Sequence, residues 1–229
     1  MTSAAPTDLA PRVRLTIFER FLADARPPLV EELMPAFALG RSDVEAILRD
    51  LAEARHIALV PGTARILMAF PFSAIPTPFR AEVRNTAYFA NCSWDVIAFH
   101  AMLGDEVRVT SACHHCARPI EVVMADGAAR RVEPASALVH LALPPSRWWE
   151  DIVATCGSTM VFFCSAEHRD ASALCGPPEE AVSLTPDEVH ALSGPIYARK
   201  FDLDYARPGR EELLAHFARI GLTGPYWQL

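Results

Sequence analysis

Two side chains with complementary chemistry stand three residues apart in the stretch NCSWD, residues 91–95. On a helix Cys92 and Asp95 would share one face, with a thiol beside a carboxyl. Asn91 is a suitable N-cap and the following apolar run ends at Gly104, so we expect Cys92 in the first turn of a helix. Free N–H groups and the helix dipole there favour a thiolate. Taken alone, the stretch fits a buried, inert cysteine beside a surface acid equally well or better.

A second thiol could come from Cys156, which stands far along the chain. It is followed by Gly157 and Ser158, a break in an apolar stretch that would leave its thiol near a turn. A core position for Cys156 is equally consistent with the sequence. Cys164 and Cys175 have no neighbours that suggest chemistry.

Cys113 and Cys116 form a C-x-x-C pair around two histidines, which is half of a zinc motif. A zinc ribbon needs a second C-x-x-C or a paired histidine, and the downstream cysteines are single. The strand and helix that flank a thioredoxin-like C-x-x-C are missing as well. Cys113 and Cys116 therefore remain candidates for a structural role or a secondary metal site, with Cys113 buried at the end of a strand.

The composition describes a globular chain with a large core. Of 229 residues, 51% are hydrophobic and 21% are charged, and the net charge is −7. We expect no membrane partner because no apolar run approaches the roughly 20 residues that span a bilayer. Residues 1–10 show no secretory signal, so we expect a cytoplasmic protein whose six cysteines are mostly reduced.

The elements that would position these residues fall into two parts. Helices are expected at 13–25, 30–39 and 42–55, followed by a β-hairpin at 57–70. This order is typical of a winged helix. Strands are expected from residue 80 on, including 106–113, 121–124 and 137–143 as one antiparallel set, before helices at 186–192 and 210–220. We therefore predict an α+β fold, with a winged-helix-like three-helix module at 1–72 and a mixed, mainly antiparallel β-sheet domain with flanking helices at 73–229.

A nucleic-acid partner is not expected, although winged helices often bind DNA. Residues 1–72 hold eight arginines against nine acids, a net charge of −1. Phosphate contacts supply most non-specific DNA affinity, and this module offers few free cations for them. A structural or accessory role for the module is the better interpretation.

The segment 88–97, the strand that ends at Cys113, and Cys156 ahead of two phenylalanines together resemble the alkylmercury (organomercurial) lyase family. The resemblance runs from about residue 70 to 164. It implies a helical N-terminal module, a catalytic C-x-x-D pair at Cys92 and Asp95, a distal catalytic cysteine at Cys156, and a structurally important cysteine at Cys113. The better-known members carry a cysteine where this chain has Gly157.

The resemblance implies protonolytic cleavage of carbon–mercury bonds to a hydrocarbon and Hg(II), without a cofactor. Cys92 and Cys156 would hold the mercury, with Asp95 as proton donor and as a further candidate ligand. Organomercurials would be the substrates, small thiols would release the product, and a mercuric reductase could receive it. Two alternatives stay open: a non-enzymatic, thiol-based metal-binding or metal-sensing winged-helix protein, and a family member that acts on another thiophilic substrate.

Overall fold

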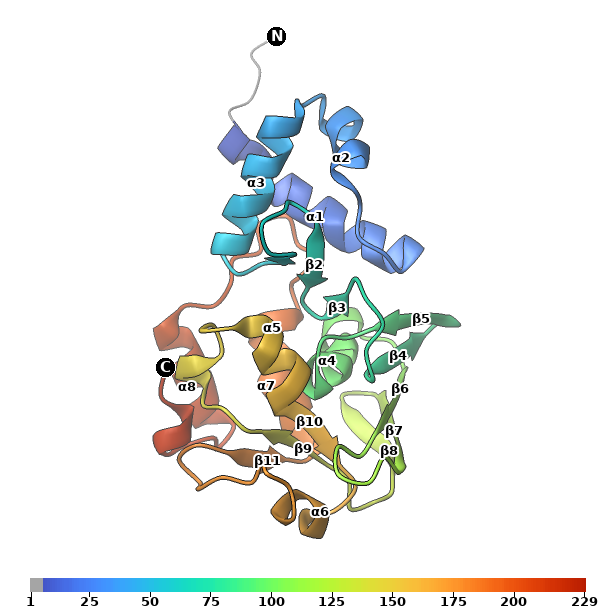
Figure 1. The fold of residues 1–229 in the computed structure, drawn as a ribbon, viewed down its shortest axis with the longest axis vertical. Coiled ribbons are helices and arrows are strands. Elements are labelled where there is room, and N and C mark those ends of the chain that lie inside the picture. The colour runs from blue at the N-terminus through green and yellow to red at the C-terminus, as the bar shows by residue number, and fades with distance from the viewer. Residues whose placement is uncertain (1–5) are drawn as a thin grey trace.

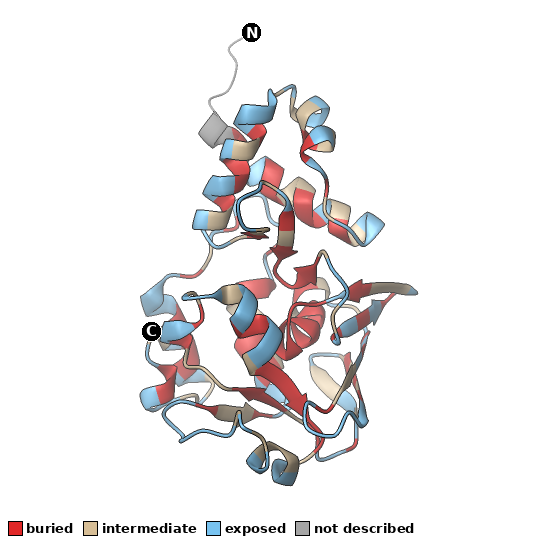
Figure 2. Ribbon diagram, in the orientation of Figure 1, coloured by how far each residue is buried: buried red, intermediate tan, exposed pale blue. Residues whose placement is uncertain are grey.

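The computed structural model describes residues 6–229, with side chains from residue 9 on. Helices and small antiparallel sheets follow one another along the chain, which confirms the predicted α+β class. In Figure 1 the helices of residues 6–53 form one end of the molecule, and the helices and strands from residue 80 on form the other. Buried residues run through both ends and meet in the middle (Figure 2).

The N-terminal part contains three helices and a small sheet. Its elements are α1 (Pro6–Asp24), α2 (Val30–Phe37), α3 (Arg41–Glu53), β1 (Ala58–Leu59), β2 (Ile66–Ala69) and β3 (Phe72–Ser73), with sheet order β1-β2-β3. This is the order that a winged helix requires, and the winged helix and the domain boundary at 72 remain predictions. The expectation that residues 1–10 carry no secretory signal falls partly on residues 1–5, which lie outside the described residues.

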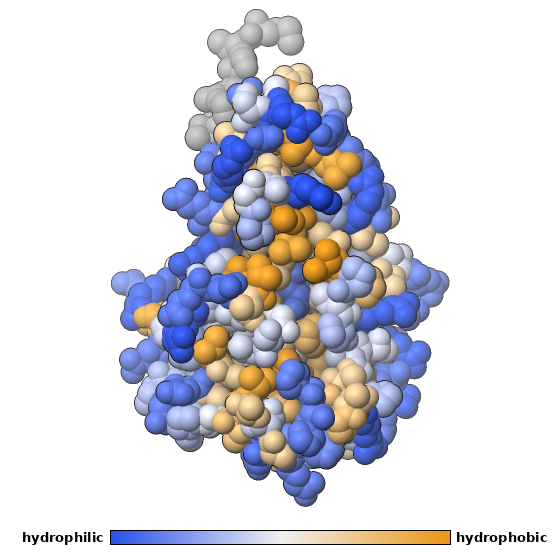
Figure 3. All heavy atoms as spheres, in the orientation of Figure 1, coloured by the Kyte–Doolittle hydropathy of each residue, from blue (hydrophilic) through white to orange (hydrophobic). Residues whose placement is uncertain are grey.

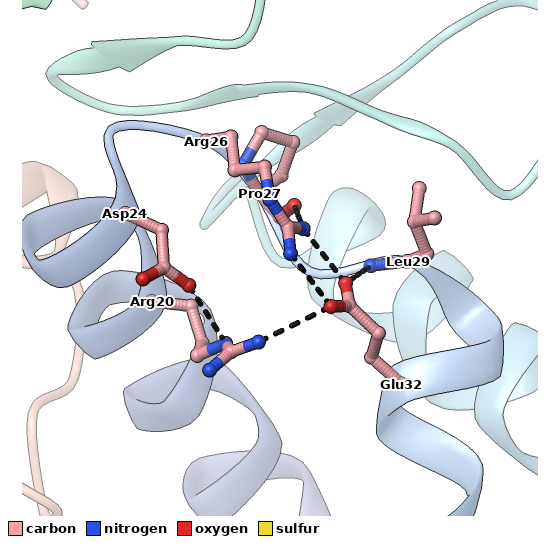
Figure 4. Close-up of polar contacts among 6 residues, drawn as sticks. All are labelled: Arg20, Asp24, Arg26, Pro27, Leu29 and Glu32. Carbon is pink, nitrogen blue, oxygen red and sulfur yellow. Dashed lines mark hydrogen bonds and ion pairs between the residues drawn. The ribbon is translucent and has the colours of Figure 1, made fainter.

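The turn between α1 and α2 is held by one carboxylate (Figure 4). Glu32 accepts hydrogen bonds from Arg26 at 2.7 and 2.8 Å, from Arg20 at 3.1 Å, and from the Leu29 backbone N–H at 2.8 Å. The bonds from Arg26 and Leu29 lower the pKa of Glu32 to about 2. The carboxylate therefore caps α2 and joins it to the end of α1.

The second part is built around one helix that is buried on every side. The α4 helix (Ser93–Leu103) has buried residues around its whole circumference, as expected for a central core helix. It ends at Gly104, whose φ of 72° is the left-handed conformation that favours glycine. The α7 helix (Pro186–Tyr197) packs against it. Residues 91–95 therefore open the helix at the centre of the molecule.

Two sheets flank this helix pair. The five-stranded sheet has the order β5-β4-β6-β7-β8, and the three-stranded sheet has the order β10-β9-β11. The strands are β4 (Arg80–Val83), β5 (Thr86–Phe89), β6 (Val107–Ala112), β7 (Pro119–Ala125), β8 (Ala128–Glu133), β9 (Leu138–Leu141), β10 (Met160–Phe163) and β11 (Val182–Leu184). The prediction that 137–143 continues the first antiparallel set was wrong, because β9 pairs with β10 and β11 instead.

The remaining elements are short connections and a C-terminal helix. They are η1 (Pro145–Arg147), α5 (Ile152–Ala154), η2 (Thr155–Thr159), α6 (Ala166–Asp170), α8 (Arg210–Arg219) and η3 (Pro225–Trp227). The chain after α7 returns to the N-terminal helices, where the buried Arg14 donates a 2.6 Å hydrogen bond to the Lys200 carbonyl. Among residues 6–229, no helix combines the length and the apolar character needed to cross a membrane.

Candidate active site

Cys92 caps the central helix with its own side chain. Its backbone is extended (φ −157°, ψ 178°) and its Sγ accepts the Asp95 backbone N–H at 3.3 Å. The prediction of Asn91 as the N-cap was therefore wrong. The buried Asn91 amide instead donates to the Pro71 carbonyl at 3.0 Å, the Phe72 carbonyl at 3.2 Å and Asp95 Oδ2 at 2.9 Å. It fixes the start of α4 against the segment around β3 and orients the carboxylate.

The distal thiol is presented by a single π-helical turn. Cys156 lies in η2, between α5 and β10, where the Thr159 hydroxyl donates to the Thr155 carbonyl at 2.7 Å. Asp151 caps the preceding α5 by accepting the Ala154 N–H at 2.9 Å. Widened turns of this kind are frequent at functional sites because they redirect a side chain. Here the turn directs Cys156 inward, where it is buried.

The structure brings together the three residues that the sequence singled out. The Sγ atoms of Cys92 and Cys156 and a carboxylate oxygen of Asp95 all lie within 4.8 Å of one another. All three residues are buried and both cysteines are free thiols. The position of Gly157 has room for a side chain, because a Cβ added there would meet nothing within 4 Å.

The surroundings of both cysteines favour the protonated thiol, contrary to the expected thiolate at Cys92. Burial raises the pKa of Cys92 well above its usual value, helped by the hydrogen bond to Cys156 and the charge of Asp95. The N–H of Asp95 acts in the opposite direction and is outweighed. The hydrogen bond to Cys92 lowers the pKa of Cys156, but burial and Asp95 leave it raised overall. Desolvation thus overrides the helix N-terminus.

Asp95 is a buried carboxyl prepared to exchange a proton near neutral pH. Burial raises its pKa to about 6, although hydrogen bonds from Tyr197, Asn91 and Cys92 stabilise the charged form. Tyr197 reaches it from the end of α7, 102 residues away, and donates its hydroxyl to Oδ1. Above pH 6 the carboxylate can accept a thiol proton, and below pH 6 it holds its own.

Two buried basic side chains interact with this carboxylate. Lys200, the single lysine of the chain, is buried with its Nζ atom over the Tyr197 and Tyr205 rings, at 5.5 and 5.1 Å. Burial, followed by the charge of Arg207, lowers the pKa of Lys200 well below its usual value. Burial also lowers the pKa of Arg207, which lines the same cavity as Asp95. These groups favour the negative charge on Asp95.

A small cavity of about 30 Å³ opens onto the three residues. Its apolar wall consists of Phe70, Trp94, Trp148, Trp149, Ile152, Met160 and Ile196. A larger pocket of about 440 Å³ lies beside it and shares Trp148, Trp149, Ile196 and Arg207 with it. The shared residues therefore separate the site from an outer vestibule. The guanidinium groups of Arg55 and Arg207 both lie over the Trp149 ring, each 4.9 Å from its centroid.

The sequence did not reveal the residues that tune and enclose the site. Tyr197, Arg207, Trp148 and Trp149 lie far from Cys92 along the chain, and no spacing connects them to it. One signal was available for Lys200, because a single lysine among twenty arginines is unusual; it was interpreted as compositional bias.

Comparison with known proteins agrees with this geometry. The family model for alkylmercury lyase (MerB) matches residues 72–198. Alkylmercury lyases are 32% identical over 131 residues (Pseudomonas putida; 57% of this chain, 59% of the relative) and 25% identical over 125 residues (Staphylococcus epidermidis; 55% and 56%). The chain thus spans a little over half the length of these curated relatives.

A solved structure shares the fold. The crystal structure of the mercury-bound form of MerB2 superposes with a TM-score of 0.66 at 20% identity, covering 81% of this chain and 88% of that one. Cys92, Asp95 and Cys156 all fall within the residues that the family model matches. The family match spans more than half of the chain, and the protein belongs to the alkylmercury lyase family.

Proposed function

We propose that this protein cleaves the carbon–mercury bond of organomercurials, protonating the carbon and retaining Hg(II) on Cys92 and Cys156. The observation that carries the proposal is the buried group of two thiols and one carboxylate within 4.8 Å. Mercury(II) is a soft cation that prefers thiolate ligands, and two of them can replace the carbon. The departing carbon needs a proton, which a positioned carboxyl can deliver.

The two thiols and Asp95 account for every proton in the proposed reaction. The first thiol binds R–Hg⁺ and its proton leaves with the displaced ligand. The second thiol gives its proton to the Asp95 carboxylate as its sulfur bonds to mercury, and Asp95 passes that proton to the carbon as the Hg–C bond breaks. The products are R–H and a bis-thiolate Hg(II), with Asp95 again ionised. The raised pKa values of both thiols and of Asp95 suit this sequence, because the required proton is already in the site.

The surroundings suit the organic part of such a substrate. The cavity wall is mostly aromatic and aliphatic. Figure 3 shows hydrophobic side chains gathered across the middle of one face, between the N-terminal helices and the sheets. The exposed Val153 adjoins the cavity residue Ile152 on α5. An alkyl or aryl group could therefore reach the thiols through the vestibule, with Trp149 as the boundary.

The proposed reaction needs thiols from the cell but no cofactor. The residues of the site supply both the mercury ligands and the proton, so the proposed reaction uses no cofactor. Small thiols would exchange Hg(II) off the buried cysteines, and a mercuric reductase could receive it. The proposed location is the cytoplasm, where such thiols are abundant.

A headspace assay tests the function. Phenylmercury or methylmercury incubated with the protein and an excess of thiol should give benzene or methane catalytically. A hydrocarbon yield no greater than that of thiol alone would reject the proposal. The matched control is Cys175→Ala, which removes an exposed cysteine outside the site and should retain full activity.

The pH dependence of turnover is expected to follow Asp95. Because its carboxylate must accept a thiol proton, kcat/KM should fall as pH decreases through about 6. Tyr197→Phe removes a hydrogen bond that lowers the pKa of Asp95, so this acid limb should move to higher pH. The control is Tyr226→Phe, which alters a buried tyrosine bonded instead to the carbonyls of Leu141 and Leu143. An acid limb unchanged in Tyr197→Phe would contradict the role of that hydroxyl.

Gly157→Ala is expected to change neither the activity nor the stability of the protein appreciably. An added methyl group would meet nothing within 4 Å, so hydrocarbon release should stay within about twofold and the free energy of unfolding should change by less than about 1 kcal/mol. Gly104→Ala is the contrasting variant, since φ is +72° there, and should destabilise by about 1 kcal/mol or more. Thermal denaturation measures both. A large loss in Gly157→Ala would mean that the turn requires glycine.

The alternative of a DNA-binding metal sensor gains no support from α3, the presumed recognition helix. Arg41 forms ion pairs with Glu31 and Glu45, and Arg49 also pairs with Glu45. Arg55, just beyond the helix, lies over Trp149. These arginines are therefore engaged within the protein, and retention on DNA at low salt would be the observation that favours the sensor.

A further inference from the structure

A second group of metal-binding side chains lies outside the active site. The Sγ atoms of Cys113, Cys116 and Cys164 and a ring nitrogen of His168 all lie within 4.8 Å of one another. The sequence offered only the first half of this set, because Cys164 and His168 stand about fifty residues downstream. The fold brings Cys164 and His168 to the C-x-x-C pair. The absence of a second C-x-x-C motif in the sequence was therefore not evidence against a metal site.

The distances suit a tetrahedral ion. Zinc binds thiolates at about 2.3 Å and imidazole at about 2.0 Å, which places neighbouring ligand atoms roughly 3.5 to 3.8 Å apart. Cys116 Sγ lies 3.8 Å from Cys164 Sγ, and Cys113 Sγ lies 3.7 Å from His168 Nδ1. Cys164 Sγ and His168 Nδ1 are hydrogen-bonded at 2.9 Å, a separation that a bound ion would lengthen. Three thiols and one imidazole form a complete zinc ligand set.

The backbone around Cys113 is already shaped to hold thiolates. The turn from Cys113 to Arg118 is closed by two hydrogen bonds, Cys113 N–H to Arg118 carbonyl at 2.9 Å and Ala117 N–H to Cys113 carbonyl at 2.8 Å. Ala117 has a φ of 59°, which folds the chain tightly after Cys116. This turn brings the Cys116 sulfur back beside the Cys113 sulfur, as a C-x-x-C pair requires around one zinc ion.

The other two ligands come from a strand-to-helix corner. Cys164 follows β10 directly, and His168 lies in α6, whose N-cap Ser165 accepts the His168 N–H at 3.3 Å. The four residues therefore bring the β6–β7 turn of the five-stranded sheet to the end of the three-stranded sheet. One backbone hydrogen bond, from His114 N–H to the Phe162 carbonyl at 2.8 Å, already connects the two sheets here.

We propose that Cys113, Cys116, Cys164 and His168 bind one structural Zn²⁺ ion that joins the two sheets. The ligand set leaves no open position, which is the mark of a structural rather than a catalytic zinc site. Cys113 and Cys164 are buried while Cys116 is exposed, so an ion could enter from the surface. The site also steadies β10, which begins directly after the turn that carries Cys156. This inference does not depend on the proposed lyase activity.

Metal analysis tests the site directly. Protein produced with added zinc and purified under reducing conditions should contain about one Zn per chain by mass spectrometry. X-ray absorption should give three sulfur ligands at about 2.3 Å and one nitrogen at about 2.0 Å. Cobalt substitution should produce the ligand-field bands of tetrahedral, thiolate-bound Co(II). Chelation should lower Tm by at least about 5 °C, because a bound structural metal contributes to folding stability.

Variants identify the ligands. Cys116→Ser changes an exposed side chain and should fold, yet should lose at least about 80% of the zinc and all sensitivity of Tm to chelators; His168→Ala should behave alike. Cys175→Ser is the matched control and should keep one zinc. The double variant Cys92→Ser/Cys156→Ser should also keep one zinc, because the active-site thiols are not part of this site.

Two results would overturn the proposal. One is wild-type protein that binds no zinc after full reduction and reconstitution with zinc. The other is zinc that persists in Cys116→Ser but disappears in the Cys92→Ser/Cys156→Ser variant, which would place the metal in the active site.

Discussion

Replacing Cys156 with alanine is expected to reduce hydrocarbon release by at least about a thousandfold. A single thiolate can displace one ligand from R–Hg⁺, but the second sulfur is needed to weaken the Hg–C bond and to supply the proton that Asp95 passes on. In the structure Cys156 faces Cys92 and Asp95 from a separate element, and no other cysteine belongs to this group of three. The variant should therefore bind an organomercurial through Cys92 without cleaving its Hg–C bond.

Mercury binding distinguishes this result from a folding defect. Cys156→Ala should retain about one equivalent of R–Hg on Cys92 by intact-protein mass spectrometry, while the bound group keeps its carbon. The circular dichroism spectrum should match that of the wild type, and Cys175→Ala serves as the matched cysteine control. Turnover within tenfold of the wild type would show that Cys156 is not the second ligand.

Asp95→Asn is the second variant with a large expected effect. The amide cannot accept or deliver a proton, so turnover should fall by about 10² to 10⁴, the usual contribution of a general acid or base. Both thiols remain, so mercury should still bind while the carbon bond stays intact. Any residual activity should lose the acid limb near pH 6, because that limb belongs to the Asp95 carboxyl.

The matched control for this change is Asp126→Asn. Asp126 is an exposed turn residue with a φ of 49°, a conformation that asparagine accepts, and it forms a surface ion pair with Arg130. Its variant should behave as the wild type in both rate and pH profile. Normal turnover in Asp95→Asn would show that Asp95 does not transfer the proton to the carbon.

Local features of the fold could be predicted from the sequence. The end of α4 at Gly104 and the turn at Asp126-Gly127 follow from residues that tolerate positive φ, and the structure has both. The three-residue spacing of Cys92 and Asp95 also places them together at one helix start. In these cases neighbouring residues decide the conformation, so no distant contact is needed to predict it.

The remaining features depend on contacts between distant segments. The state of the Cys92 thiol was predicted from the helix N-terminus, whereas burial on all sides of α4 determines it. Tyr197 meets Asp95 only because α7 packs on α4. Likewise, Cys164 and His168 join the Cys113 turn only through the pairing of segments that carry no shared sequence signal.

A single-turnover experiment tests whether Cys92, Cys156 and Asp95 together cleave the carbon–mercury bond. Reduced protein in excess over phenylmercury, without added thiol, should release one benzene per phenylmercury and retain one Hg(II) that blocks both Cys92 and Cys156 against alkylation. In D₂O the benzene should carry one deuterium. If phenylmercury binds and no benzene above the protein-free control is released, the two thiols and Asp95 do not perform this reaction.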